Sequence, residues 1–500
     1  MPCTTILAGK NATNDGSTII ARNDDGGFDT KKIIVVRPEE QPKVYKSVIG
    51  HLEIELPEDP LRVTFAPNVN RKEGIWAACG MNSANVGMTA TETVTSNSRV
   101  LGADPLVEYQ EKTEEKEEIP GGIGEEDLTA IVLPFIKSAR EGVLRLGALL
   151  EKYGTYEMNG IAFNDENDIW WMETIGGHHW IAKRVPDDRV VIMPNQFGLD
   201  EFDFEDAYGE KRENLCSSDL KEFTQKNHLD LSPDGNFNPR LAFGSRSDHD
   251  HIYNTPRAWY MARYFLPRTY HWDGPSADFT PESNDIPWSF VPEHRVTVEE
   301  IRYLLGSHYQ GTPYDPYEKR EAFSGKYRSI GVPNSDLCGM IQIRGYMPEY
   351  AKGLEWFSMG GSGFTAFFPF YGNVSSLPDY ISGTPERVST EHMYWHSRLI
   401  AALTDTHYGT GELLDARYLE AVRNKAMAIL SEYDGRILTN KAPENEAEPQ
   451  EGLSEAGEQL LSEANEKILR MVKEESDKAL EKLLKNAGEH AKNRYHRNDN

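Results

Sequence analysis

The order of secondary structure that the sequence predicts constrains the fold more than any other feature. Short apolar runs separated by Gly, Asn and Asp predict strands over residues 1–100 and again over 160–196, with Arg189–Met193 continuing the second meander. Apolar residues spaced three and four apart over 128–150 predict one amphipathic helix, kinked at Pro134. This order of strands, helix and strands favours helices packed on antiparallel sheets.

Residues 197–330 are rich in Asp, Pro, Tyr and Trp and lack clear periodicity, so we expect helices and long loops that decorate the core. Helical periodicity returns from Met393 to about Asp434. The chain beyond this point is highly charged but keeps a thin apolar stripe, which predicts a solvated amphipathic helix or pair of helices. The expected organisation is a core over 3–435, insertions at about 197–330 and a charged helical tail over 436–500.

Charge and cysteine content narrow the functional class. The chain carries 53 Lys and Arg against 80 Asp and Glu, a formal charge of −27, which argues against binding to nucleic acid or an anionic membrane. The sequence contains no apolar run long enough to span a bilayer and no secretory segment at its start. Its four cysteines form no CxxC pair. We therefore expect a cytoplasmic enzyme with a small-molecule or peptide substrate.

Cys3 is the most informative single residue. It lies two positions after the initiator methionine, at the start of a predicted strand, and Arg22, Asp24 and Asp25 follow a predicted hairpin. A cysteine at a chain terminus can act as nucleophile while its own α-amine, with a pKa near 8, carries the proton. A neighbouring cation such as Arg22 favours the thiolate. This pattern points to acyl transfer without a separate histidine.

Around these residues the sequence resembles the N-terminal-nucleophile (Ntn) hydrolases, and within them the cysteine dipeptidases of the dipeptidase A type. The similarity runs patchily from Cys3 to about Asp434, and secernins and the bile-salt hydrolase/penicillin V acylase group are more distantly similar. The resemblance implies an α+β fold, the αββα four-layer sandwich, with large insertions and a helical C-terminal part. It rests mainly on the segments Cys3–Lys10, Asp15–Asp25, Cys79–Met88, Pro194–Gln196 and Asn254–Trp259.

The same resemblance implies roles for individual residues. Cys3 is the expected nucleophile, flanked by Arg22 and by Asp25, whose carboxylate is expected to contact the terminal amine; Asp24 is the alternative. Two donors for the oxyanion are expected. They are the backbone N–H of Asn82 and the side-chain amide of Asn195, and Arg257 is a further expected active-site residue.

One departure concerns the N-terminus, because removal of Met1 alone leaves Pro2 in front of Cys3. The resemblance therefore requires that residues 1–2 are removed as a short propeptide. It also implies hydrolysis of dipeptides without a cofactor. We expect no metal site, since the histidine pairs His178–His179 and His249–His251 match no recognised metal spacing.

Two alternative functions remain open at this point. One is an N-acyl amide hydrolase, and the other is a non-enzymatic, secernin-like interaction protein. A dipeptidase requires a carboxylate for the substrate ammonium group, and the sequence alone does not place it. The resemblance and the tail together favour self-association.

Overall fold

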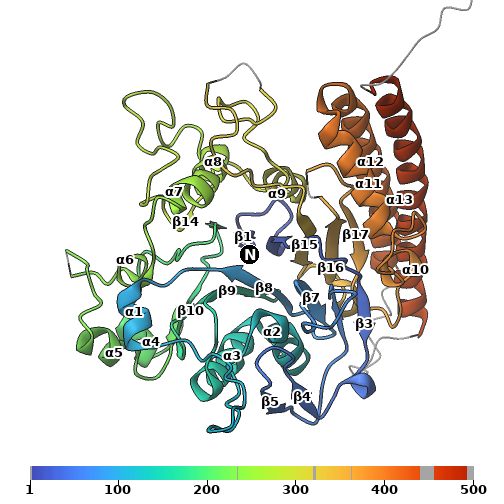
Figure 1. Ribbon diagram of the computed structural model, residues 1–500. Coiled ribbons are helices and arrows are strands. Elements are labelled where there is room, and N and C mark those ends of the chain that lie inside the picture. Colours follow the sequence, from blue (N-terminus) through green and yellow to red (C-terminus); the bar gives the residue numbers. More distant parts are fainter. Residues whose placement is uncertain (1–2, 234, 319–321, 362, 440–454, 492–500) are drawn as a thin grey trace, which may run out of the picture.

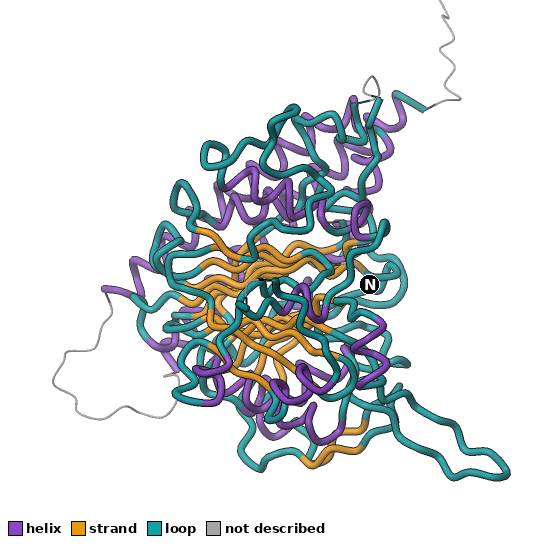
Figure 2. Tube along the Cα trace, turned by 90° about the vertical axis from the view of Figure 1, so that its left-hand side faces the viewer, coloured by secondary structure: helices purple, strands orange, loops and turns teal. Residues whose placement is uncertain are grey.

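Two antiparallel sheets stacked face to face form the core of the protein (Figure 2). The computed structural model describes residues 3–233, 235–318, 322–361, 363–439 and 455–491. One sheet has seven strands in the order β14-β12-β1-β2-β15-β16-β17, and the other has eight in the order β13-β11-β10-β9-β8-β7-β6-β3. The first sheet contains β1 (Thr4–Ala8), β2 (Thr18–Asp25), β12 (Val190–Met193), β14 (Ser289–Phe290), β15 (Ser335–Ile343), β16 (Gly353–Met359) and β17 (Phe368–Tyr371).

The eight-stranded sheet is built from an earlier part of the chain. Its members are β3 (Ile34–Val36), β6 (Val63–Phe65), β7 (Cys79–Asn82), β8 (Gly87–Thr93), β9 (Asn159–Asn164), β10 (Ile169–Ile175), β11 (His179–Arg184) and β13 (Asn214–Cys216). A separate hairpin joins β4 (Val44–Lys46) to β5 (Glu53–Glu55).

Helices cover the outer faces of both sheets (Figure 1). On the eight-stranded sheet, α2 (Glu125–Val132) packs on β8, and α3 (Ala139–Tyr153) packs on β9, β10 and β11. On the seven-stranded sheet, α8 (Thr255–Phe265) and α9 (Val298–Leu305) pack near β12, β1 and β2. The remaining short helices are α1 (Ser98–Ala103), α4 (Phe204–Tyr208), α5 (Leu220–Lys226), α6 (Pro239–Phe243), α7 (Asp250–Tyr253) and α10 (Asp379–Ser382).

Strict alternation along β1 and β2 separates two parts of the core. Leu7 and Ile20 lie in the hydrophobic cluster between the sheets, together with Trp171 of β10. Ile6 and Ala21, their neighbours in the sequence, lie in the cluster beneath α8 and α9. Because successive side chains of a strand point to opposite faces, odd-numbered residues of β1 and even-numbered residues of β2 face the second sheet.

The single helix predicted over 128–150 is two helices. The first, α2, ends at Val132 and continues as a 3₁₀ turn over Leu133–Phe135, and α3 begins only at Ala139. Pro134 has no N–H to continue the helical ladder, and Ser138 caps the new helix by accepting a hydrogen bond from the Glu141 N–H. The helix is therefore interrupted between α2 and α3 rather than kinked.

The prediction that Arg189–Met193 continues the second meander is wrong. Strands β9, β10 and β11 form that meander, but β12 pairs with β1 in the other sheet. A buried apolar run predicts a strand, whereas its partner depends on long-range packing that the local pattern does not contain.

The C-terminal region is helical, as predicted, and is docked on the core. It comprises α11 (Met393–Thr406), α12 (Tyr408–Thr439) and α13 (Glu455–Glu489), which lie side by side in Figure 1. The predicted stripe of α13 is buried against the core and its neighbouring helices, including Leu461, Ile468 and Val472. The expected tail boundary at 435/436 falls inside α12. None of the described helices is both long and apolar enough to cross a lipid bilayer.

Candidate active site

Strand alternation places Cys3 at the junction of the two sheets. Cys3 immediately precedes β1, and in the β1–β2 pair Thr5 lies opposite Arg22. The side chains of Cys3, Thr5 and Arg22 therefore share the face that looks toward the second sheet. Cys3 is buried, as is Arg22. A two-residue offset along one strand and a single cross-strand pairing are enough to bring thiol and guanidinium together.

Arg22 is the centre of the charge network around the thiol. Its Nη2 atom lies 3.0 Å from the Sγ atom of Cys3. The same nitrogen lies 3.0 Å from the carboxylate of Asp24 and 3.0 Å from that of Glu125, at the start of α2. Its Nη1 atom donates to main-chain oxygens of the second sheet, those of Ala78 and Ala90. The guanidinium is thereby fixed from both sheets, with one edge against the thiol.

The surroundings keep the thiol protonated in this form of the chain. Burial raises the pKa of Cys3 to about 12, and the nearby carboxylates add to the effect, while the charge of Arg22 opposes it. Although burial opposes it, the cations Lys31 and Arg22 hold the pKa of Asp24 below its usual value. The side chain of Cys3 is thus a neutral thiol, whereas the carboxylate of Asp24 is ionised.

Arg257 links the Cys3 main chain to Asn195. From α8, its Nη1 atom donates to the carbonyl oxygen of Cys3 and, at 2.6 Å, to Thr4 Oγ1. Its Nη2 atom donates to Asn195 Oδ1 at 2.7 Å and to Asn254 Oδ1 at 2.8 Å. Burial lowers the pKa of Arg257 to about 10, so the side chain is still charged at neutral pH. The structure thus joins three of the sequence-predicted residues, Cys3, Asn195 and Arg257.

Asn195 follows β12 and is held in one orientation. Its Oδ1 accepts from Arg257, and its Nδ2 donates to the carbonyl oxygen of Thr93 at 2.9 Å. The amide nitrogen therefore points toward the end of β8, where the two sheets meet. A fixed N–H donor next to the nucleophile is what a developing oxyanion requires.

Asp25 lies on the opposite face of β2 from Arg22. Its carboxylate accepts from Arg328 Nη2 and from Ser335 Oγ. The predicted contact of Asp25 with the terminal amine stays a prediction, because Met1 and Pro2 lie outside the described residues. Asp24, the alternative, faces the same side as the thiol and contacts Arg22.

Asn82, like Asp25, makes its described contacts outside this cluster. Its backbone N–H donates to the Val86 carbonyl oxygen at 3.0 Å, within the turn that joins β7 to β8. Its side-chain amide donates to the Leu133 and Ile136 carbonyl oxygens of the break between α2 and α3. In the described structure this N–H is engaged in the turn, so Asn82 stabilises a turn and a helix break.

Two carboxylates that the sequence analysis missed complete the cluster. Glu125 pairs with Arg22, and Glu92, in β8, accepts a hydrogen bond from Thr5 Oγ1 at 2.7 Å. Both act electrostatically on the Cys3 thiol. In the sequence, Glu92 could have been noticed as the one charged residue of the strand Gly87–Thr93.

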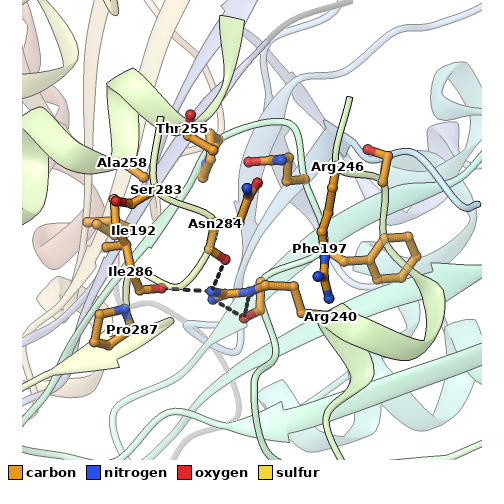
Figure 3. A pocket seen from close by; sticks show the side chains of 14 residues that line it. Ile192, Phe197, Arg240, Arg246, Thr255, Ala258, Ser283, Asn284, Ile286 and Pro287 are labelled. Carbon is orange, nitrogen blue, oxygen red and sulfur yellow. Dashed lines mark hydrogen bonds between the residues drawn. The ribbon is translucent and has the colours of Figure 1, made fainter. Parts of the chain in front are cut away.

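Neither of two notable cavities opens on the face that carries Cys3. A small one of about 40 Å³ adjoins Asn195, between Pro194, Gln196 and α8. Figure 3 shows that Arg240 there is bonded to main-chain oxygens, which are those of Gly198, Asn284 and Ile286. This space is far below the ~300 Å³ of typical ligand pockets.

A larger cavity of about 560 Å³ lies between α9 and α12, beside Arg302, Trp356 and Asp415. It is on the outer face of the seven-stranded sheet. Among the residues that the structure describes, no three His, Cys, Asp or Glu side chains gather as a metal site requires.

Comparison with known proteins gives consistent matches along the chain. Residues 2–420 match Peptidase family C69. The chain is 49% identical to the dipeptidase of Bifidobacterium longum, over the full length of both. It is 45% identical to the probable dipeptidase A of Streptococcus pyogenes serotype M3, again over both full lengths. It is 44% identical to dipeptidase A of Lactobacillus helveticus, over 83% of this chain and 84% of that protein.

Proposed function

The chain belongs to peptidase family C69, and from this premise we propose that it is a dipeptidase whose nucleophile is the thiol of Cys3. Family membership makes it a peptidase, and the names of its full-length relatives support dipeptides as the substrate class. The observation that carries the choice of nucleophile is the 3.0 Å contact between Arg22 Nη2 and Cys3 Sγ. The three other cysteines, Cys79, Cys216 and Cys338, have no such contact with a guanidinium among the described residues.

Activation requires the removal of Met1 and Pro2, which turns the Cys3 nitrogen into a free α-amine. This amine is the base in our proposal, because an α-amine has a pKa near 8 and lies within the same residue as the thiol. Arg22 then stabilises the thiolate that the proton transfer creates. We keep Asp25 as the carboxylate expected to orient the amine, and Asp24 as the partner of Arg22.

The proposed reaction transfers the same acyl group twice, first to the Cys3 thiol and then to water. The thiolate attacks the scissile carbonyl carbon, and the C–N bond breaks as the α-ammonium gives its proton to the leaving amino acid. A thioester to Cys3 remains. The α-amine then takes a proton from water and the hydroxide attacks the thioester. The C–S bond breaks, the second amino acid is released, and the Cys3 thiolate takes the proton back from the α-ammonium.

Stabilisation of the oxyanion is assigned to Asn195. Arg257 orients its amide and also bonds to the Cys3 carbonyl oxygen, so nucleophile and donor are held by one cation. Each such donor typically contributes about 10²–10³ in rate. The backbone N–H of Asn82 stays a prediction as the second donor, and it would have to leave the Val86 carbonyl oxygen of the β7–β8 turn to serve the oxyanion.

We further infer that the fold is the Ntn-hydrolase sandwich. The support is the pair of stacked antiparallel sheets with helices on both outer faces, and a nucleophile at the start of a central strand. A catalytic region over 3–435, a cytoplasmic location and self-association remain predictions.

The test compares the processed wild-type protein with C3A on dipeptides, a tripeptide and an N-acyl amino acid. We expect hydrolysis of dipeptides by the wild type and none by C3A. The matched control is C79A, which removes another buried thiol and is expected to keep activity within about threefold. Hydrolysis confined to N-acyl substrates would instead assign an amidase, and equal behaviour of wild type and C3A would point to a non-enzymatic role.

A further inference from the structure

Three carboxylates act on the Cys3 thiol, and two of them already have cationic partners. Asp24 pairs with Lys31 at 2.7 Å and with Arg22 at 3.0 Å. Glu125 pairs with Arg22 at 3.0 Å. Glu92 has no cation within ion-pair distance in the described part of the chain. It is therefore the carboxylate in this cluster that is available to an incoming positive charge.

A bulge in β8 turns Glu92 toward Cys3. Met88 and Ala90 face α2 and α3, on the outer side of the eight-stranded sheet. Regular alternation would place Glu92 on that side too. The register shifts between Ala90 and Glu92 opposite β9, which inserts one extra residue and reverses the face. Glu92 consequently bonds to Thr5 Oγ1 across the gap between the sheets.

One oxygen of Glu92 has nothing to bind in the described structure. The side chain is 0% exposed, and its Oε2 atom accepts from Thr5, but its Oε1 atom has no hydrogen-bond partner among the described residues. A buried carboxylate oxygen without a partner is unfavourable until a donor arrives. Burial also raises the pKa of Glu92 to about 8, against the opposing charge of Arg257. Burial thus favours the neutral carboxyl group, and a cation that approaches Glu92 favours the carboxylate.

The position also suits the geometry of a dipeptide. Thr5 and Cys3 lie two residues apart on one strand face, or about 7 Å, and Glu92 contacts Thr5. In a dipeptide the α-ammonium nitrogen is only about 2.5 Å from the carbon that the thiolate attacks. A carboxylate that recognises this ammonium therefore has to lie near the nucleophile, and Glu92 meets this requirement through its bond to Thr5 and its electrostatic effect on the Cys3 thiol.

We propose that Glu92 binds the α-ammonium group of the substrate and makes the enzyme select peptides with a free N-terminus. The inference rests on the proposed dipeptidase function and adds the residue that sets this selectivity. The substrate ammonium donates to Glu92 Oε1, forming a charge-assisted hydrogen bond in a buried site. An N-acylated peptide offers no positive charge there, so Glu92 disfavours it.

The experiment measures kcat/KM for alanyl-alanine and for N-acetyl-alanyl-alanine with the processed full-length wild type, E92Q and E92D. Where the acetylated peptide is not cleaved, its inhibition constant takes the place of KM. We expect E92Q to lower kcat/KM for the free dipeptide about 10–100-fold, mainly through KM, as for a lost hydrogen bond to a charged group. The acetylated peptide should change less than about threefold, and E92D, which keeps the charge, should recover part of the selectivity.

The control is T5V, which removes the hydroxyl donor to Glu92 Oε2 and leaves the charge in place. T5V should keep the preference for the free dipeptide. Equal losses for both peptides in E92Q, or unchanged selectivity, would overturn the assignment of Glu92. Should E92Q fail to fold, E92A takes its place, and a wild-type preference for the free dipeptide in E92A would overturn the assignment as well. A wild type that cleaves no dipeptide would overturn the proposed function itself, which is a different result.

Discussion

The Nη2 atom of Arg22 lies 3.0 Å from the Sγ atom of Cys3, and the guanidinium that carries it is held by both sheets of the core. The carboxylates of Asp24 and Glu125 form ion pairs with the same nitrogen. The thiol is therefore next to a cation that cannot move away without breaking several buried interactions. This contact is the basis of the nucleophile assignment, and the predictions below test it and its surroundings.

Replacing Arg22 should change both the reactivity of the thiol and the stability of the fold. In processed R22Q the cation that favours the thiolate is gone, so the pH midpoint for alkylation of Cys3 should rise by about one unit or more. Asp24 loses one of its two cations and Glu125 its ion-pair partner, which typically costs about 3–5 kcal/mol of unfolding free energy. Rates of iodoacetamide modification against pH, and denaturant unfolding, measure the two effects.

The control for this variant is R37Q. Arg37 is exposed and, among the residues that the structure describes, forms ion pairs only with Glu39 and Glu40 at the surface, so neither the alkylation midpoint nor the stability should change appreciably. An R22Q enzyme with a wild-type alkylation profile would refute the role assigned to Arg22.

Asn195 should contribute to catalysis far more than to substrate affinity. N195A removes the fixed amide donor and should reduce kcat about 10²–10³-fold with little change in KM. In the control N254A, Arg257 loses a different acceptor and the Asn195 carbonyl oxygen loses a donor, but the side-chain amide of Asn195 keeps its bond to Arg257. N254A should therefore be much more active than N195A. Comparable activities for the two variants would mean that Asn195 only positions Arg257.

Glu355 makes the stability of the protein depend on pH. It is buried in β16, where burial raises its pKa to about 8, opposed by a hydrogen bond from Thr64. An unfolded glutamate has a pKa near 4.3, so the folded state binds the proton more tightly. The stability contributed by the neutral group is complete below about pH 4.3 and falls as the pH rises toward 8.

E355Q should therefore gain stability relative to the wild type as the pH rises from 5 to 8. Urea unfolding at both pH values measures this difference. E420Q, which changes an exposed glutamate of α12, should show the same stability difference from wild type at both pH values. A difference between E355Q and wild type that does not depend on pH would contradict a neutral Glu355 in the fold.

The last helix should behave as part of the folded core. Ile468 of α13 is buried in a cluster with residues of α11 and α12, so I468A should cost about 2–5 kcal/mol of unfolding free energy. Leu484 of the same helix is 61% exposed, and L484A should change the stability by less than about 0.5 kcal/mol. Equal effects of the two variants, measured by denaturant unfolding, would show that α13 is not docked as described.

The sequence predicted the parts of this structure that depend on local pattern. The strand–helix–strand order, the stripe of α13 and the pairing of Cys3 with Arg22 through a hairpin all follow from periodicity and short spacing. The pairing of β12 with β1 did not follow from the local pattern, because strand partners depend on packing between distant segments.

The same distinction between local pattern and long-range packing applies to the residues of the site. Alternation along β2 places Asp24, rather than Asp25, on the face of Arg22, although the resemblance favoured Asp25 as the active-site carboxylate. Glu92 could not be placed, because one bulge in β8 reverses its direction. Asn82 was expected near the nucleophile from resemblance alone, and its side-chain partners lie in the break between α2 and α3, where the sequence predicted only a kink at Pro134.

The most direct test of the central claim is the N-terminal sequence and intact mass of the active enzyme, determined on the same sample that is assayed with dipeptides. We predict a chain that begins at Cys3, hydrolyses dipeptides, and loses activity when one equivalent of alkylating reagent modifies Cys3. An enzyme that retains Pro2 and is nevertheless fully active would contradict it, since the Cys3 nitrogen would then be an amide and could not act as the base.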